Sequence, residues 1–226
     1  MKILLNSLLG LCLMGGMAQV QAEPQNSAAI QAEQVNTHNP YEMVQVVAKK
    51  TFDRFNRDFQ KIEADTGHLK VIVREELMPY VDYKYASYKV MGKYLRETTK
   101  QQRHDFVDAF EGYLISTYAQ AFTEYTNQKV QFEKGADYTH EKIVEVKVSI
   151  IEDGRPPIKL LFKVRRLKDD SWKAFDMVAE GVSLLASKQS EVTSLIRKEG
   201  IDSVIQMLKK KTGENISAAK TVENRL

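Results

Sequence analysis

The hydrophobic positions of this chain recur at two spacings, and the change between them divides the sequence into three parts. From residue 40 to residue 127 apolar residues return every three or four positions, which predicts amphipathic helices. After residue 128 they alternate with polar residues, which predicts β-strands with one buried face. Helical spacing returns from residue 182 to residue 211. This order predicts an α+β fold in which a helical layer covers an antiparallel sheet.

The first two helices are predicted from a cap and a breaker. Asn39 and Pro40 fit the N-cap and the first helical position of a helix whose apolar stripe runs to Phe55. A second helix covers residues 69–78, and Pro79 is expected to end it.

The next two helices begin at polar capping residues. Asp82 is placed to cap a helix over residues 83–95, within the stretch 80–95 that holds five tyrosines. Thr99 with Gln102 forms a capping box that opens the longest helix, residues 100–127. Aromatic residues recur along one face of that helix and form a long apolar wall.

The second part predicts a sheet of about four antiparallel strands. Two long strands, residues 142–151 and 158–165, are joined by a turn at 152–157, and shorter strands cover 130–132 and 172–178. The residues expected to face inward from the two long strands are Val144, Val146, Val148, Ile150, Ile158, Leu160, Phe162 and Val164.

The third part predicts two helices, residues 182–200 and 202–211. Asp202 is expected to cap the second. Residues 212–226 are polar and are expected to fray.

The first 22 residues have the pattern of an export signal. Lys2 precedes an apolar stretch that is too short to span a bilayer, and cleavage is expected after Ala22. Cys12, the single cysteine, would leave with this segment, and Leu11 before it disfavours lipid attachment. Residues 23–39 are polar and predict a flexible leader, so one domain is expected over residues 40–211. The predicted compartment is the bacterial periplasm.

The chemistry of the chain disfavours several function classes. Loss of Lys2 lowers the formal charge from +3 to +2, which is too small to suggest nucleic-acid binding. Residues 180–183 (EGVS) lack the glycine that follows serine in a nucleophile elbow, and no glycine-rich phosphate loop is present. The four histidines are isolated from one another and are expected to be solvated surface residues. We therefore expect no catalytic site, no metal and no cofactor, which points to a binding protein.

Five stretches of the sequence together resemble one known family. Residues 39–54, 71–94, 99–122, 154–166 and 172–192 are similar, in order, to the MlaC or toluene-tolerance family of periplasmic phospholipid carriers. The chain departs from the family pattern at Tyr88, Met91 and residues 188–190. The resemblance implies an NTF2-like or cystatin-like sheet and a monomeric, soluble shuttle. It also implies phospholipid cargo, and as partners an outer-membrane lipoprotein complex and an inner-membrane complex with a lipid-binding ring domain and an ATPase.

A lipid carrier has a simple physical requirement. Two sixteen-carbon tails contain about 30 methylenes, which cost on the order of 25 kcal/mol in water at about 0.8 kcal/mol each. A dry apolar cavity supplies nearly the same environment as the bilayer, while the head group remains in water at the mouth. Basic residues that could lie at the mouth or dock acidic partners are Lys84, Lys89, Lys93, Arg96 and Arg155.

The predicted pocket lies between the inward face of the sheet and the helical layer. Tyr85 and Tyr88 are expected to pack on other helices or at the surface. The residues expected to line the pocket are Val73, Tyr80, Val81, Tyr83, Val90, Tyr94, Phe106, Phe110, Leu114, Val146, Val148, Leu160, Phe162 and Val164. The same spacing also fits a filled core, which would suit a periplasmic adaptor protein without cargo. A lipid-modifying enzyme is a third, less favoured class.

Overall fold

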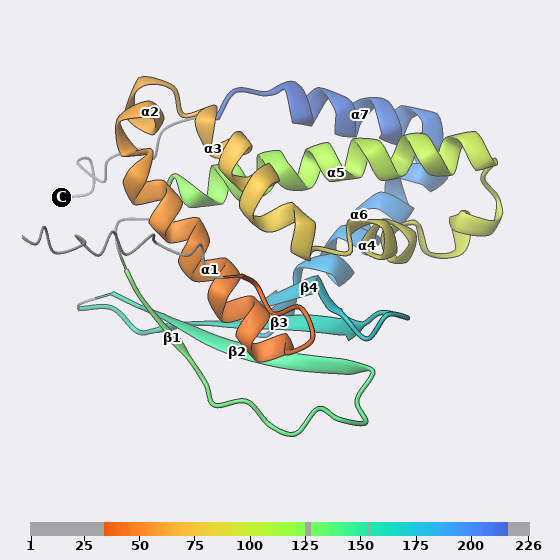
Figure 1. The fold of residues 1–226 in the computed structure, drawn as a ribbon. Helices are drawn as coiled ribbons and strands as arrows, with labels where there is room; N and C mark the ends of the chain where they lie inside the picture. The colour runs from red at the N-terminus through yellow and green to blue at the C-terminus, as the bar shows by residue number, and fades with distance from the viewer. Residues whose placement is uncertain (1–33, 125–127, 153, 217–226) are drawn as a thin grey trace, which may run out of the picture. The chain divides into compact units, whose positions relative to one another are not determined.

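A computed structural model describes residues 34–124, 128–152 and 154–216. The predicted signal peptide lies outside the described residues. Within them the chain forms helices, then an antiparallel sheet, then helices (Figure 1), which confirms the predicted α+β class. Described in chain order, the helices are α1 (Pro40–Arg57), α2 (Phe59–Ala64), α3 (His68–Ile72), η1 (Val73–Leu77), η2 (Met78–Tyr80), α4 (Tyr83–Met91), η3 (Gly92–Arg96), α5 (Lys100–Phe122), α6 (Leu184–Glu199) and α7 (Ile201–Gly213).

The predicted caps of the first helices are present. The Asn39 side chain accepts hydrogen bonds from two backbone amides in the first turn of α1. Asp82 accepts from the amide of Tyr85 at the start of α4. Thr99 and Gln102 form a complete capping box at α5. Each cap satisfies backbone N–H groups that have no partner inside the helix.

Several helix boundaries differ from the sequence prediction. Pro79 does not stop the second helix, because α3 continues as a π turn and then as the 3-10 turn η2, in which the proline sits where no N–H is needed. Gly92, with φ of 55°, ends α4 before the predicted residue. Helix α5 ends at Phe122, before the predicted end at residue 127. Asp202 lies inside the first turn of α7, whose N-cap is Gly200 without a side-chain hydrogen bond.

The sheet has five strands in the order β1-β2-β3-β4-β5, each antiparallel to its neighbour. They are β1 (Lys129–Phe132), β2 (Ile143–Ile151), β3 (Ile158–Arg166), β4 (Trp172–Ala179) and β5 (Val182–Ser183). Strand β5 occupies the first two residues of the predicted helix 182–200, so α6 begins at Leu184. Alternate residues of β2 are buried as predicted, but Ile158, the first residue of β3, is 46% exposed.

Three clusters of hydrophobic residues hold these elements together. The α4–α7 cluster joins four helices, the sheet cluster joins α1 to β2, β3 and β4, and the α1–α5 cluster joins α1, α3, η1 and α5. Figure 1 shows α1 crossing the sheet while α5 and α7 run side by side in the helical layer. The cores therefore lie within the helical layer and between that layer and the sheet.

The described fold extends beyond both ends predicted for the domain. The amide of Trp172 donates a hydrogen bond of 2.8 Å to the carbonyl of Thr37, and Val35 packs against the sheet cluster. At the other end α7 runs to Gly213, and Ile216 is buried in the α1–α5 cluster. Residues 34–39 and 212–216 are thus tied to the domain by hydrogen bonds and apolar contacts.

Candidate functional site

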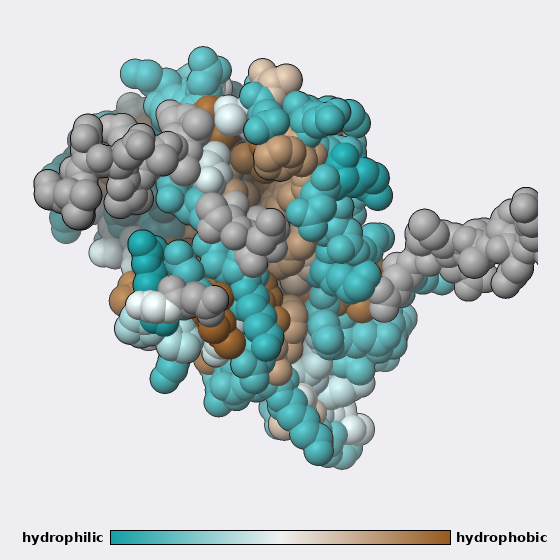
Figure 2. All heavy atoms as spheres, turned by 90° about the vertical axis from the view of Figure 1, so that its left-hand side faces the viewer, coloured by the Kyte–Doolittle hydropathy of each residue, from teal (hydrophilic) through white to brown (hydrophobic). Residues whose placement is uncertain are grey.

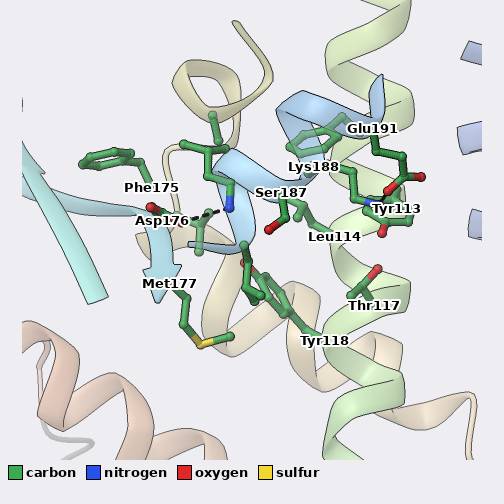
Figure 3. A pocket seen from close by; sticks show the side chains of 15 residues that line it. Tyr113, Leu114, Thr117, Tyr118, Phe175, Asp176, Met177, Ser187, Lys188 and Glu191 are labelled. Carbon is green, nitrogen blue, oxygen red and sulfur yellow. Dashed lines mark hydrogen bonds and ion pairs between the residues drawn. The ribbon is translucent and has the colours of Figure 1, made fainter. Parts of the chain in front are cut away.

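A cavity of about 230 Å³ lies between helix α5, strand β4 and helix α6 (Figure 3). The start of α4 closes it on a further side through Ala86 and, just before that helix, Val81. Its complete lining is Val81, Ala86, Phe110, Tyr113, Leu114, Thr117, Tyr118, Phe175, Asp176, Met177, Leu184, Leu185, Ser187, Lys188 and Glu191. Most of these side chains are apolar or aromatic, so the cavity suits an apolar ligand.

A bulge in strand β4 shapes the sheet side of the cavity. Lys163 pairs with Asp176 and Val164 pairs with Ala174, so Phe175 has no partner opposite it on β3. The Phe175 ring instead meets the Tyr85 ring edge to face, with centroids 5.2 Å apart. Because a bulge bends its strand and re-aims the side chains beyond it, β4 presents consecutive residues to the cavity.

Asp176 connects β4 to the start of α6. Its side chain is 4% exposed and accepts hydrogen bonds from Ser183 Oγ (2.8 Å) and from the amide of Leu185 (3.0 Å). Lys163 Nζ lies 3.8 Å away. A carboxylate at a helix N-terminus is favourable, because it meets unsatisfied N–H groups and the positive end of the helix dipole. This carboxylate therefore links the β4 wall of the cavity to the α6 wall by hydrogen bonds.

The side of the cavity formed by α6 opens to water. Ser187 and Glu191 are exposed, and Leu184 is 41% exposed. Lys188 lies between them, with its Nζ 4.7 Å from the centre of the Tyr113 ring and 2.6 Å from Glu191 Oε2. Burial lowers the pKa of Lys188, but hydrogen bonds to Glu191 and Tyr113 outweigh it, so the pKa is raised. Lys188 therefore stays protonated at the mouth, where it is paired with Glu191.

Tyr118 is the tyrosine of the site whose pKa is shifted most clearly. Its half-buried side chain lines the cavity from α5. Burial, with a smaller contribution from the negative charge of Asp176, raises the pKa of Tyr118 to about 12. A phenolate is disfavoured there because it would lose hydration without gaining a positive partner.

The structure brings three of the predicted pocket residues, Val81, Phe110 and Leu114, to the cavity. The others pack in the clusters around it, and their contact with lipid stays a prediction. The α4–α7 cluster includes Val90, Tyr94 and Phe106; the sheet cluster includes Tyr80, Val146, Val148, Leu160, Phe162 and Val164; the α1–α5 cluster includes Val73 and Tyr83. Tyr88 packs in the helical layer, as predicted, whereas Tyr85 packs on strand β4 rather than on another helix or at the surface.

The polar residues of the site were not predicted. None of Lys84, Lys89, Lys93, Arg96 and Arg155 lines the cavity. Asp176 and Lys188 do, although they lie on different elements and neither stands in a motif. On α5 a signal existed, because Tyr113 and Tyr118 continue the apolar spacing that marked Phe110 and Leu114.

Hydrophobic residues also reach the surface elsewhere. On the side of the molecule that bears α2 in Figure 1, they form a hollowed band between hydrophilic walls (Figure 2). The band runs from the helical layer towards the sheet. Apolar lining is therefore available beyond the cavity itself.

A group of titratable residues outside the cavity links three helical elements. His68 Nε2 lies 2.8 Å from the buried Asp58 carboxylate, so the prediction of a solvated histidine is wrong for His68. Hydrogen bonds from Arg54 and then His68 hold the pKa of Asp58 well below its usual range. The Arg54 guanidinium also forms ion pairs with the carboxylates of Glu75 and Glu76, each with an N–O distance of 3.1 Å. These bonds tie α1 to α3 and η1.

The described ranges, residues 34–124, 128–152 and 154–216, lack two further features. Within those ranges there is no group of three or more histidine, cysteine, aspartate or glutamate side chains that could hold a metal ion. No helix there is both long and apolar enough to cross a membrane.

Comparison with known proteins identifies the family and the fold of this chain. The family model of the MlaC protein matches residues 45–210. A relative from Haemophilus influenzae, the intermembrane phospholipid transport system binding protein MlaC, is 36% identical over 180 residues, covering 79% of this chain and 84% of the relative. The fold resembles that of a phospholipid-binding protein from Ralstonia solanacearum solved in complex with a phospholipid. That comparison has a TM-score of 0.67 and 22% identity, and covers 75% of this chain and 94% of the other. The chain belongs to the MlaC family.

Proposed function

We propose that this protein is an exported carrier that encloses the acyl chains of a phospholipid and moves it across the periplasm between the inner and outer membranes. The observation that carries the proposal is the apolar cavity between α5, β4 and α6, open along α6. The name of the Haemophilus influenzae relative and the phospholipid bound by the Ralstonia solanacearum protein support it. The carrier would thereby maintain the lipid asymmetry of the outer membrane.

The energetics of the cavity favour a greasy occupant. A dry void costs about 24 cal/mol per Å³, so 230 Å³ corresponds to about 5.5 kcal/mol if water stays out. An acyl chain would recover that free energy and would also gain about 0.8 kcal/mol for each methylene removed from water. The volume is below the range of about 300–1,000 Å³ that is usual for ligand pockets. Enclosing a two-chain lipid therefore requires the walls to move apart.

The remaining parts of the proposal concern export and partners. Residues 1–22 would direct the chain to the periplasm and be removed after Ala22. The carrier would act as a monomer and meet an outer-membrane lipoprotein complex at one end of its path. At the other end it would meet an inner-membrane complex with a lipid-binding ring domain and an ATPase. It would need no cofactor or metal, since the lipid is cargo.

The direct test is the lipid content of the purified protein. Full-length protein is expressed with its own signal sequence, isolated without detergent, and examined by native mass spectrometry and by thin-layer chromatography of an organic extract. We expect a bound mass equal to a phospholipid and an unmodified phospholipid spot. Protein without lipid, under conditions in which an established carrier keeps its cargo, would contradict the proposal. Hydrolysed lipid would instead support an enzyme.

A filled-core adaptor is the alternative. It predicts that apolar ligands do not bind, and it is disfavoured because the space between α5, β4 and α6 is not filled. Displacement of an environment-sensitive fatty-acid probe by added phospholipid would separate the two, since an adaptor would neither bind nor release the probe.

A further inference from the structure

We propose that Lys188 binds the phosphate group of the lipid at the cavity mouth, and that Glu191 is the counter-ion which the phosphate displaces. The proposal rests on the proposed function and deepens it, because it assigns a head-group subsite to a cavity otherwise defined by its apolar walls.

The charges around the cavity single out Lys188. It is the one lysine or arginine among the residues that line the cavity, where Asp176 and Glu191 are the acidic ones. Asp176 is engaged by the N-terminus of α6 and by Lys163. A phosphate that enters with a lipid would meet repulsion from the Glu191 carboxylate and attraction from Lys188, the one cation among the lining residues, whereas Lys163 offsets the charge of Asp176.

The position of the ammonium matches the position of a phosphate. The Lys188 side chain is 20% exposed and crosses the Tyr113 ring, with Nζ 4.7 Å from the ring centre. Figure 3 shows it beside Tyr113 and Glu191, at a different end of the cavity from Phe175 and Met177. A phosphate joins apolar tails to a hydrated head group, so it must lie where an apolar lining meets water. At this mouth Lys188 occupies that boundary, with exposed Thr117 and Ser187 nearby.

The contact between Lys188 and Glu191 is suited to exchange. The two residues are one turn apart on α6 and 2.6 Å apart, and the Glu191 side chain is 45% exposed. Exposed ion pairs are weak, and a released glutamate here returns to water at little cost. A phosphate is a strong charge-assisted acceptor, and lysine approaches it as a compact point charge. The Tyr113 ring keeps the ammonium at the mouth while its anionic partner changes.

Lys93 provides a matched control. Its Nζ lies 5.1 Å from the centre of the Tyr94 ring, so it makes the same kind of contact as Lys188, but it does not line the cavity. A general loss of positive charge from the surface would affect the Lys93→Gln and Lys188→Gln variants equally. A specific phosphate contact would affect only the second.

The test compares two lipids with identical tails. Phosphatidylglycerol and diacylglycerol each displace an environment-sensitive fatty-acid probe from the wild-type protein and from the Lys188→Gln, Glu191→Gln and Lys93→Gln variants. We expect Lys188→Gln to bind phosphatidylglycerol about tenfold more weakly, and Glu191→Gln to bind it about twofold more tightly because the competing carboxylate is gone. Affinity for diacylglycerol, and all affinities of Lys93→Gln, should stay at the wild-type values.

The results separate this subsite from the carrier function. Equal losses for both lipids in Lys188→Gln, no loss for either lipid, or weaker phosphatidylglycerol binding in both Lys188→Gln and Glu191→Gln would overturn the proposal while leaving lipid binding intact. Failure of every protein to bind either lipid would refute the carrier function and the subsite with it.

A last experiment adds inorganic phosphate as the competitor. If the affinity for phosphatidylglycerol is unchanged by about 10 mM inorganic phosphate, the result supports a lipid head-group site. Competition by phosphate would instead identify a free-phosphate site and overturn the assignment.

Discussion

The two halves of helix α5 carry the same spacing of hydrophobic residues but face different surroundings. In the first half Phe106 is fully buried and its ring stacks on that of Phe110, 5.9 Å away, within a cluster closed by α4, α6 and α7. In the second half Leu114 and Tyr118 face the bulged strand β4 across the cavity. The difference lies in the elements that pack against α5, since the helix itself is continuous.

The comparison explains how one fold combines stability with a hollow interior. The closed cluster of the first half contains Val90, Met91 and Val192, all without exposed surface, and supplies the packing that holds the helices together. The second half can then leave space unfilled without unfolding the domain. Stability and cargo binding are expected to respond to substitutions in different halves of the same helix.

The largest expected effect is on stability, from truncation in the closed half. Phe106→Ala should lower the free energy of unfolding by about 3–5 kcal/mol, because a fully buried ring is replaced by a void. Leu114→Ala, beside an existing cavity, should cost less than about 2 kcal/mol, because its neighbours already lack full packing. Urea titrations followed by circular dichroism measure both. Equal losses in the two variants would show that the halves do not differ.

The next effect is on cargo, from filling the open half. Leu114→Trp should occupy part of the 230 Å³ cavity and weaken lipid binding at least about tenfold, with little change in stability. The control is Phe106→Leu, which should lose stability but retain lipid affinity once folded. Undiminished lipid binding in Leu114→Trp, measured by probe displacement, would place the acyl chains elsewhere.

A smaller effect is expected where β4 meets α6. Asp176→Ala removes the acceptor for Ser183 Oγ and for the Leu185 amide, and should lower the free energy of unfolding by about 1 kcal/mol. Asp176→Asn keeps a carbonyl oxygen at this place and should lose less. Thermal unfolding of the two variants side by side is the measurement. A more stable Asp176→Ala would mean that the carboxylate strains the cavity wall instead of bracing it.

The smallest effect at neutral pH is expected for Tyr118. Folding raises its pKa from 10.0 to about 12, so the folded state favours the neutral phenol. The stabilisation is complete below pH 10 and is lost as the pH rises from about 10 to about 12. Tyr118→Phe should have unchanged stability at pH 7 and lack this alkaline loss. If tyrosine absorbance showed no group titrating above the others in the wild type, water would reach the inner cavity.

The sequence predicted the regular parts of the fold because local chemistry determines them. The Thr99 and Gln102 capping box and the alternation in β2 need only neighbouring residues, and both are present in the structure. The two-residue strand β5 has no alternation long enough to detect. Gly200 took the capping position expected for Asp202, because its φ of 83° lets the chain reverse between α6 and α7.

The candidate site was predictable along one face of α5 and at Val81, just before α4. Phe110 and Leu114 follow the apolar spacing of α5, and that spacing was visible. Buried Val146 and Val148 share the same sequence signature as a pocket wall, but they pack in the sheet cluster. Lys188 and Asp176 depend on how α6 meets the bulge in β4, a tertiary feature without a local sequence signal.

The central claim is that acyl chains lie in the space between α5, β4 and α6, and two methionines can test it directly. Met177 lines the cavity, whereas Met91 is fully buried in the closed cluster. In deuterated protein with labelled methionine methyl groups, bound phosphatidylglycerol should give nuclear Overhauser effects from its acyl methylenes to the Met177 methyl and not to the Met91 methyl. Contacts to Met91, or none to Met177 in protein that demonstrably holds lipid, would contradict the account.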